Sequence, residues 1–345
     1  MTIQTQPLIN LIPGDHTDTI DELISAIKEN PAELFSLANQ SIVSARQFNR
    51  DMVMQLCNLA AKYEKTPIPA QRPLTGKILI SAFYEPSTRT RLSFESAWHR
   101  LGGDVMSITD PLTTGIAKGE SHKDVAEMLS AYGDLVVLRD PNEKTIYEMM
   151  QSLRIPVINA GNGIEEHPTQ ALADMYTIFK WRPELMETSL DASRKIRIGI
   201  IGVPSRMRTV RSLLLLLSLF PDAIKEVVII SDSNEIFSEN QLEELEDRGL
   251  TIRVSQNINK ELPEIDVIYI NAIAWVGNSF EEHGNSFRLD KDSPLKGDAI
   301  ILHPLARGEE LSAELDDTLH NWYFDQARGA VFMRMALLTC YVWLF

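Results

Sequence analysis

Short apolar runs that alternate with helix-patterned segments are the feature that most limits the fold of this chain. Residues 77–83, 135–138 and 156–160 have the length and composition of buried strands. Residues 92–101 instead carry apolar side chains at helical spacing. Strands that alternate with helices predict α/β architecture with doubly wound parallel sheets, in which ligands collect at the carboxyl ends of the strands.

The alternating pattern breaks once, in a polar connector around residues 180–194, and then starts again. The length agrees with this, because 345 residues exceed what one hydrophobic core usually organises. We therefore expect a first domain over residues 41–182 and a second over residues 183–325. Residues 326–345 read as a final helix, and residues 1–40 read as a helical extension to which we assign no chemistry.

Charge and cysteine content exclude several classes of protein. A formal net charge of −15 and an isoelectric point near 5.0 argue against non-specific binding to nucleic acid or anionic membranes. The two cysteines, Cys57 and Cys340, form neither a disulfide nor a metal-binding pattern, so we expect no metal and a reducing cytoplasm. The first residues lack a signal-peptide pattern, and the longest aliphatic run, residues 213–217, is too short to cross a bilayer.

The clearest chemistry lies where the strand over residues 77–83 turns into a helix. Ser87, Thr88, Arg89 and Thr90 occupy that turn. A helix start favours an anion, because its backbone N–H groups are unpaired and carry partial positive charge. Hydroxyl groups and a forked guanidinium make such a seat specific for phosphate. Taken alone, however, a turn of this composition is more often a simple helix cap with solvent-facing arginines.

The whole block FYEPSTRTRLSFESAWHRLGG, residues 83–103, closely resembles the carbamoyl-phosphate motif of the aspartate and ornithine transcarbamoylases. Its Glu-Pro lead and Leu-Ser-Phe-Glu sequel are more similar to the aspartate branch. A second family motif is matched by HPTQ at residues 167–170, and the resemblance extends from about residue 41 to the C-terminus. It implies a carbamoyltransferase without a cofactor, in which the last helix returns to pack on the first domain.

The resemblance also implies which residues hold carbamoyl phosphate. Arg139 matches an arginine that contacts both the phosphate and the carbonyl oxygen, and His167 matches a donor to that oxygen. Gln170 would accept from the carbamoyl NH2, a bond that acetyl phosphate cannot make. The set implied is Ser87, Thr88, Arg89, Thr90, Thr114, Lys118, Arg139, His167, Gln170 and Leu305, of which Arg89, Thr90, Arg139, His167 and Gln170 carry the catalysis.

Considered without the family resemblance, two of these residues have simpler structural interpretations. Arg139 would favour a surface ion pair with Asp140, and a histidine before a proline is more often structural than catalytic. No side chain in the set is an obvious general base. We therefore predict that the departing phosphate accepts the proton of the amine while His167 remains a neutral donor.

Residues 114–120 resemble the family's mobile loop, which reaches into the active site of the neighbouring subunit. Lys118 matches the lysine of that loop, and Thr114 stands where the family commonly has serine. The resemblance implies a homotrimer with shared active sites, and leaves regulatory chains possible. In isolation, Lys118 reads as an exposed loop lysine.

The acceptor half departs from the family pattern. Arg208 matches an arginine that binds the α-carboxylate of aspartate, but Ala272 occupies the position of the arginine that reads the side-chain carboxylate. Leaving a carboxylate unpaired lowers binding by about a hundredfold or more. Ala274 and Trp275 suggest a less acidic acceptor, whereas Arg206, which has no expected family counterpart, offers a charge from another direction.

The family's His-Pro-Leu-Pro turn appears here as residues 303–306, with Leu305 and Ala306 at its end. In the family the peptide after the leucine is cis, and its carbonyl faces the attacking amine. A cis bond before alanine costs about 3 kcal/mol, so a trans or strained turn is expected here.

These observations predict a carbamoyltransferase that acts on the amino group of an amino-acid-like acceptor, and on aspartate weakly or not at all. An aspartate carbamoyltransferase of pyrimidine synthesis, with Arg206 supplying the missing charge, is one alternative. A catalytically silent paralogue that binds another subunit is a second. A nucleotide-binding dehydrogenase is disfavoured, because Gly199 and Gly202 do not complete the G-x-G-x-x-G fingerprint.

Overall fold

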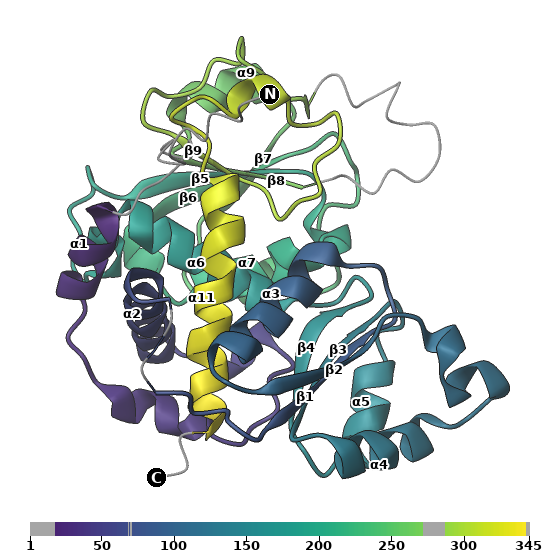
Figure 1. Cartoon of the computed structure of the whole chain (residues 1–345). Coiled ribbons are helices and arrows are strands. Elements are labelled where there is room, and N and C mark those ends of the chain that lie inside the picture. Colours follow the sequence, from purple (N-terminus) through teal and green to yellow (C-terminus); the bar gives the residue numbers. More distant parts are fainter. Residues whose placement is uncertain (1–17, 68, 70, 272–286, 343–345) are drawn as a thin grey trace, which may run out of the picture.

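The structure is a computed structural model that describes residues 18–67, 69, 71–271 and 287–342. Two parallel sheets dominate it (Figure 1), as the alternating sequence pattern predicts. Each predicted strand corresponds to one of the strands β1–β9. Buried parallel strands are continuous apolar runs, which is why they can be found in a sequence without an alternating pattern.

The first sheet has the strand order β2-β1-β3-β4. Its strands are β1 (Ile78–Phe83), β2 (Asp104–Ile108), β3 (Leu135–Asp140) and β4 (Val157–Asn162). The helices between and after them are α3 (Thr88–Arg100), α4 (His122–Tyr132), α5 (Thr145–Met150) and α6 (Pro168–Trp181). All three strand pairings are parallel, so β1, β3 and β4 end at the same edge of the sheet.

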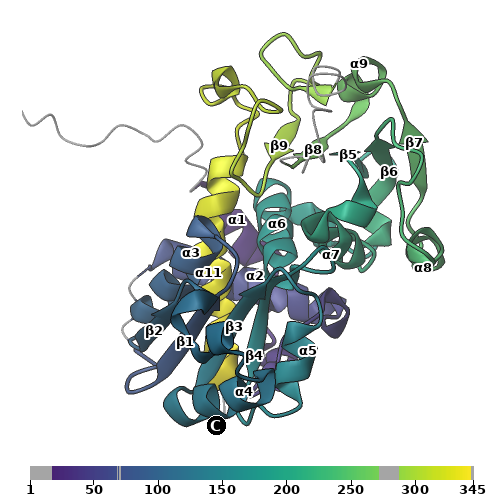
Figure 2. The ribbon, with the colours of Figure 1, turned by 90° about the vertical axis from the view of Figure 1, so that its right-hand side faces the viewer.

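The second sheet has the order β7-β6-β5-β8-β9 and is also parallel throughout. Its strands are β5 (Ile196–Ile201), β6 (Ile224–Ile230), β7 (Ile252–Ser255), β8 (Val267–Ile270) and β9 (Ile300–Leu302). Its helices are α7 (Arg208–Leu217), α8 (Gln241–Asp247) and α9 (Ile258–Glu261). Figure 2 shows the second sheet above the first, with α6 and α7 between them.

The N-terminal region contributes α1 (Asp18–Ala26), the 3-10 segment η1 (Pro31–Leu37) and α2 (Arg50–Lys65). Residues 44–65 carry apolar side chains at helical spacing and predict a single helix, but this prediction is wrong at its start. Ser44 caps a separate 3-10 turn, η2 (Ala45–Gln47), and the Asn49 side chain then accepts from the Met52 N–H to begin α2. Two closely spaced N-cap residues therefore divide one apolar pattern into two elements.

The last helix, α11 (Tyr323–Val342), leaves the second domain and packs against α2, α3 and α6 of the first (Figure 1). It is buried on several sides at once, with Met333, Met335 and Leu338 all inaccessible. This explains why its sequence is apolar all round rather than along one stripe. None of the described helices is long and apolar enough to span a bilayer.

A buried ionic cluster joins α11 to the first domain. The ammonium of Lys180, which is 0% exposed, lies 2.8 Å from Glu64 and 3.0 Å from Asp325 at the start of α11. Removing one partner of a buried cluster leaves uncompensated charge, which costs far more than the loss of an exposed pair.

Lys180→Met is therefore expected to lower the free energy of unfolding by about 3–5 kcal/mol, measured by urea unfolding. The matched control is Lys62→Met, because Lys62 pairs with Glu29 at a half-exposed site. That control should cost less than about 1 kcal/mol. If the two substitutions lowered the free energy of unfolding equally, burial would not be the reason that the Lys180 cluster stabilises the fold.

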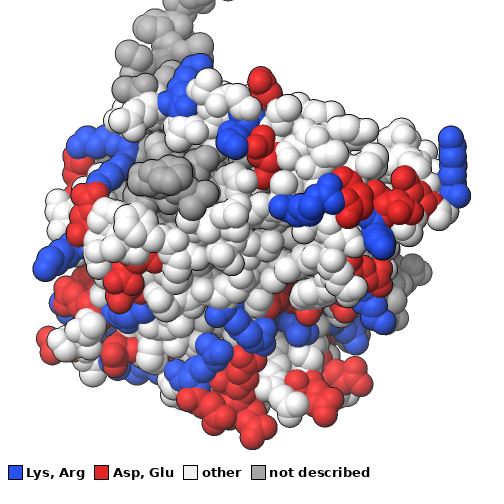
Figure 3. Space-filling view, turned by 90° about the horizontal axis from the view of Figure 1, so that it is seen from below, with Lys and Arg blue, Asp and Glu red and all other residues white. Residues whose placement is uncertain are grey.

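Charge is mixed over the surface in the view from below. Figure 3 shows acidic and basic side chains beside one another and an uncharged area between them, without an extended basic patch on that face. The described part of this face therefore has no basic surface that would attract an anion.

Candidate active site

A cavity of about 830 Å³ lies at the carboxyl ends of strands from both sheets. It is lined from one side by the β1–α3 turn, the end of β3 and the start of α6, and from the other by the β5–α7 turn and the end of β8. The predicted site residues that line it are Ser87, Thr88, Arg89, Thr90, Arg139, His167, Gln170, Arg206, Arg208 and Leu305. The fold thus brings together side chains that are more than 200 positions apart in the sequence.

The remaining predicted residues lie elsewhere. After β2, Thr114 caps the 3-10 segment Gly115–Lys118, which Lys118 ends, and neither residue lines the cavity of its own chain. Ala306 is also absent from the described lining. Ala272, Ala274 and Trp275 fall outside the described residues.

The turn before α3 is not closed by a side-chain cap. Ser87 stands at the N-cap position in extended conformation, yet its hydroxyl makes no capping hydrogen bond. The interpretation of Ser87 as a simple cap is therefore wrong. Ser87 and Arg89 line the cavity together with the other residues of this helix start, where unpaired backbone N–H groups favour an anion.

Glu85, which sequence reasoning did not single out, joins two arginines from the two domains. Its carboxylate accepts from Arg139 Nε at 3.1 Å and from the two terminal nitrogens of Arg208 at 3.0 and 3.2 Å. Arg139 therefore pairs with Glu85 and not with the adjacent Asp140. Although burial opposes it, Arg208 and Arg139 hold the pKa of Glu85 below its usual range.

Arg208 also fixes the loop that precedes His167. Its guanidinium donates to the backbone oxygen of Gly163 at 2.7 Å. Gly161 has φ +113°, and a Cβ added there would lie 3.1 Å from that guanidinium. The glycines of this turn therefore allow backbone and guanidinium to approach closely.

His167 is 3% exposed at the start of α6. Burial, followed by the positive charges of Arg139, Arg208 and Arg334, places its pKa well below the usual value. Its backbone N–H donates to Ser212 Oγ at 2.9 Å, which attaches the residue to α7. An imidazole in this setting is neutral at physiological pH.

NMR titration should leave the imidazole signals of His167 in their neutral positions down to about pH 5.5, where an exposed histidine is mostly protonated. A lowered folded-state pKa means that the unfolded chain binds the proton more readily, so this group lowers stability as the pH falls below about 6.5. The His167→Asn variant assigns the signals. A midpoint near 6.5 would contradict the expected neutrality.

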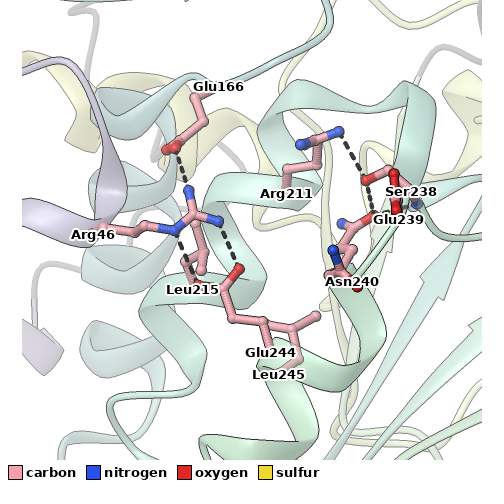
Figure 4. Close-up of a pocket in the computed structure, with 10 residues that line it drawn as sticks. Arg46, Glu166, Arg211, Leu215, Ser238, Glu239, Asn240, Glu244 and Leu245 are labelled. Atoms are coloured by element: carbon pink, nitrogen blue, oxygen red, sulfur yellow. Dashed lines mark hydrogen bonds and ion pairs between the residues drawn. The ribbon is translucent and has the colours of Figure 1, made fainter.

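A second cavity of about 420 Å³ is lined by Glu166, the residue before His167 (Figure 4). There Arg46 donates to Glu166 at 2.9 Å and to Glu244 of α8 at 2.6 and 3.0 Å. Glu166 is buried and also accepts from the Ser44 and Ser212 hydroxyls. Arg46 thus links the two domains next to the loop that carries His167.

The turn over residues 303–306 holds Leu305 against the cavity. The Leu305–Ala306 peptide is cis, so the expected trans alternative is wrong. The backbone N–H of Leu305 donates to His303 Nδ1 at 2.8 Å, and His303 Nε2 lies 2.9 Å from Glu310. The imidazole of His303 is fully buried and fixes this turn.

The acceptor end of the cavity is more exposed. Arg206 lines it, but its side chain is 59% exposed, and its guanidinium lies 3.8 Å from the carboxylate of Glu235. Asp232, Ser233 and Asn234, which sequence reasoning missed, line the same end after β6. The sequence signal that could have identified these three residues is their position shortly after the end of a predicted strand. Among the described residues, no cluster of three or more His, Cys, Asp or Glu could hold a metal.

Comparison with known proteins agrees with this geometry. The model of the aspartate/ornithine carbamoyltransferase carbamoyl-P binding domain matches residues 40–180, and that of the Asp/Orn binding domain matches residues 194–341. The aspartate carbamoyltransferase catalytic subunit of Methanopyrus kandleri is 37% identical over 311 residues, covering 88% of this chain and 97% of the relative. That of Alkaliphilus oremlandii is 36% identical over 310 residues, covering 88% and 91%.

A solved structure of Trypanosoma cruzi aspartate transcarbamoylase, in complex with carbamoyl phosphate and aspartate, superposes with a TM-score of 0.81. The two sequences are 33% identical, and the match covers 91% of this chain and 99% of that one. The two matched domains span most of the chain, and the matches to the carbamoyltransferase relatives cover nearly the whole length of those relatives. The chain is thus a carbamoyltransferase that belongs to the aspartate/ornithine carbamoyltransferase family.

Proposed function

We propose that this enzyme transfers the carbamoyl group of carbamoyl phosphate to the amino group of an amino-acid-like acceptor other than aspartate, with aspartate at most a weak substrate. The observation that supports it most is one cavity that joins the seat at Ser87–Thr90 to Arg208 of the other domain. Arg208 would bind one carboxylate of the acceptor. Ala272, in place of the second arginine, leaves a second carboxylate without its expected partner.

The proposed mechanism depends on positioning and electrostatic stabilisation, without a cofactor. Ser87, Thr88 and Arg89 hold the phosphate. Thr90, Arg139 and His167 donate to the carbonyl oxygen as negative charge develops there, and His167 does so as a neutral imidazole. The amine forms the new C–N bond, the bond from carbon to the phosphate oxygen breaks, and the departing phosphate takes the proton of the amine.

The acceptor side is proposed to consist of Arg208, the Leu305 carbonyl and the residues around Ala306, with Arg206, Ala272, Ala274 and Trp275 shaping the remainder. The cis peptide after Leu305 is the geometry that the family resemblance leads one to expect of this turn.

An amine panel incubated with isotopically labelled carbamoyl phosphate tests the proposal, read as the mass of the carbamoylated product. The expected result is an acceptor with one carboxylate whose kcat/KM exceeds that of aspartate by about a hundredfold or more. Aspartate as the best substrate would overturn it. If every amine fails while a phosphonate analogue of carbamoyl phosphate still binds, the chain is a silent paralogue.

Aspartate carbamoyltransferase activity is the second candidate, because Arg206 lines the acceptor end and the curated relatives carry that name. An Arg206→Ala variant separates the two. If Arg206 supplies the missing charge, this change raises the KM for aspartate by about tenfold or more, but leaves an acceptor with one carboxylate nearly unaffected.

The homotrimer implied by residues 114–118 is part of the proposal. Thr114 and Lys118 lie outside the cavity of their own chain, as side chains that serve a neighbour's site would. Mixing and reassembling two inactive variants, Lys118→Ala and His167→Ala, is expected to restore part of the activity, since some mixed sites contain neither substitution. Complete failure of mixed trimers to regain activity would exclude shared sites.

A further inference from the structure

A buried carboxylate lies directly behind Gln170. Asp174 is 0% exposed on α6, one helical turn after Gln170. Its Oδ1 accepts from Gln170 Nε2 at 2.8 Å and from Gln326 Nε2 at 2.6 Å, and its Oδ2 accepts from the Tyr269 hydroxyl at 3.1 Å. One carboxylate thus connects the cavity to α11 and to β8 of the second sheet.

The direction of these bonds follows from a backbone group. Gln326 Oε1 accepts from the backbone N–H of His303 at 2.8 Å, and a backbone N–H can only donate. The NH2 of Gln326 must then face Asp174. The same oxygen, Asp174 Oδ1, bonds to both glutamines, and an ionised carboxylate oxygen can only accept. It therefore accepts from the NH2 of Gln170 as well, and the carbonyl oxygen of Gln170 is left to face the cavity.

Protonation of the carboxylate leaves this direction unchanged. Burial raises the pKa of Asp174 to about 7, so a proton is present on it for part of the time near neutral pH. The two glutamines share Oδ1, whereas among the described residues Oδ2 bonds only to the Tyr269 hydroxyl, which can accept as well as donate. The proton therefore goes to Oδ2.

At its other end the same chain reaches the Leu305 turn. His303 Nδ1 accepts from the Leu305 N–H, so its hydrogen is on Nε2 and is donated to Glu310. Burial lowers the pKa of His303, although Glu310 opposes this, and the ring is neutral. An uninterrupted series of hydrogen bonds thus runs from Gln170 through Asp174, Gln326 and His303 to Leu305, and its two ends line the same cavity.

We propose that Asp174 and Gln326 are positioning residues that hold the Gln170 amide with its oxygen toward the ligand, and that this is what makes the cavity select an NH2 group over a methyl group. The inference rests on the proposed function, since it takes the ligand to carry a carbamoyl group. If the Gln170 oxygen is held in place, a ligand that ends in a methyl group binds more weakly. A methyl group donates no hydrogen bond, so the oxygen would be left buried and unpaired. An amide free to turn over would lose this selection.

Two phosphonates test it without any acceptor: phosphonoacetamide, which ends in an NH2, and 2-oxopropylphosphonate, which ends in a methyl group at the same place. By calorimetry the wild type should bind the amide about ten- to hundredfold more tightly than the ketone. Asp174→Leu and Gln326→Leu should reduce this ratio by about tenfold, with the Kd of the ketone nearly unchanged.

Two control variants separate positioning from stability. Asp174→Asn keeps an oxygen that can accept from both glutamines, as protonated Asp174 does, and should keep the ratio. Thr177→Val removes a buried hydroxyl one turn further along α6, bonded only to Ala173 O within the helix, and should also keep it. If Asp174→Leu does not fold, Gln326→Met is the milder change that breaks the same chain.

The outcomes distinguish the two proposals. An unchanged ratio in folded Asp174→Leu and Gln326→Leu would overturn the positioning role, and so would an equal loss in Thr177→Val. Failure of the wild type to bind either phosphonate would instead overturn the proposed function. A wild type that binds both equally overturns the selection while leaving the phosphate seat intact.

Discussion

Replacing Arg89 with alanine should lower kcat by about a hundred- to a thousandfold, the usual effect of losing one donor aimed at developing negative charge. Arg89 lines the cavity at the start of α3, and its guanidinium makes no hydrogen bond or ion pair with another described side chain. Burial lowers its pKa, which reflects the cost of keeping this charge partly out of water. A guanidinium held in this way is available to an anionic ligand.

The change is measured by steady-state kinetics with the best amine of the acceptor panel, and by calorimetry with inorganic phosphate. Arg100→Ala is the matched control, because Arg100 ends the same helix and, among the residues that the structure describes, bonds to Ser96 and Pro67 alone. The control should change kcat by less than about twofold. Retention of a tenth of kcat by Arg89→Ala would exclude Arg89 from the catalytic set.

The second large effect is expected at Arg208. Arg208→Ala should lower kcat/KM for the acceptor by about a hundredfold or more, since a carboxylate would lose a two-pronged charged partner. The KM for carbamoyl phosphate should change much less, because the phosphate seat lies on the other domain. Arg208→Lys keeps the charge but not the fork, and should recover only part of the loss.

Arg211→Ala is the control for Arg208, one turn along α7, where its guanidinium bonds to Ser238 beside the second cavity. The proposed role of Arg208 would be refuted by a variant that loses carbamoyl-phosphate binding yet keeps its acceptor KM. Because Arg208 also holds Glu85 and the Gly163 oxygen, circular dichroism and thermal unfolding must show that the variant is folded.

Much of the fold, and one group of residues that line the cavity, could be predicted from the sequence, for local reasons. Buried parallel strands are continuous apolar runs, and Ser87–Thr90 form a contiguous turn whose hydroxyls and arginine share one helix start. The start of α2 was predicted wrongly, because the competition between the Ser44 and Asn49 caps is decided by hydrogen bonds rather than by apolar spacing.

The partners of these residues could not be predicted in the same way. The bonds that Glu85 accepts from Arg139 and Arg208 join the turn before α3 to the end of β3 and to the start of α7, which meet only when the chain is folded. Asp174 and Gln326 are 152 positions apart, and neither carries a sequence signal beyond its polarity. The sequence gives the identity of each polar group, but the partner of that group depends on which elements pack together.

The sequence by itself therefore determined the two parallel α/β domains and the turn that lines the cavity at Ser87–Thr90, because each of these depends on residues close together in the chain. Only the tertiary structure decided that Glu85 holds two arginines, that the Leu305–Ala306 peptide is cis, and that the NH2 of Gln170 donates to Asp174. The physical reason is that a hydrogen bond has a direction and a partner, and in a buried network both are set by groups that only folding brings within about 3 Å.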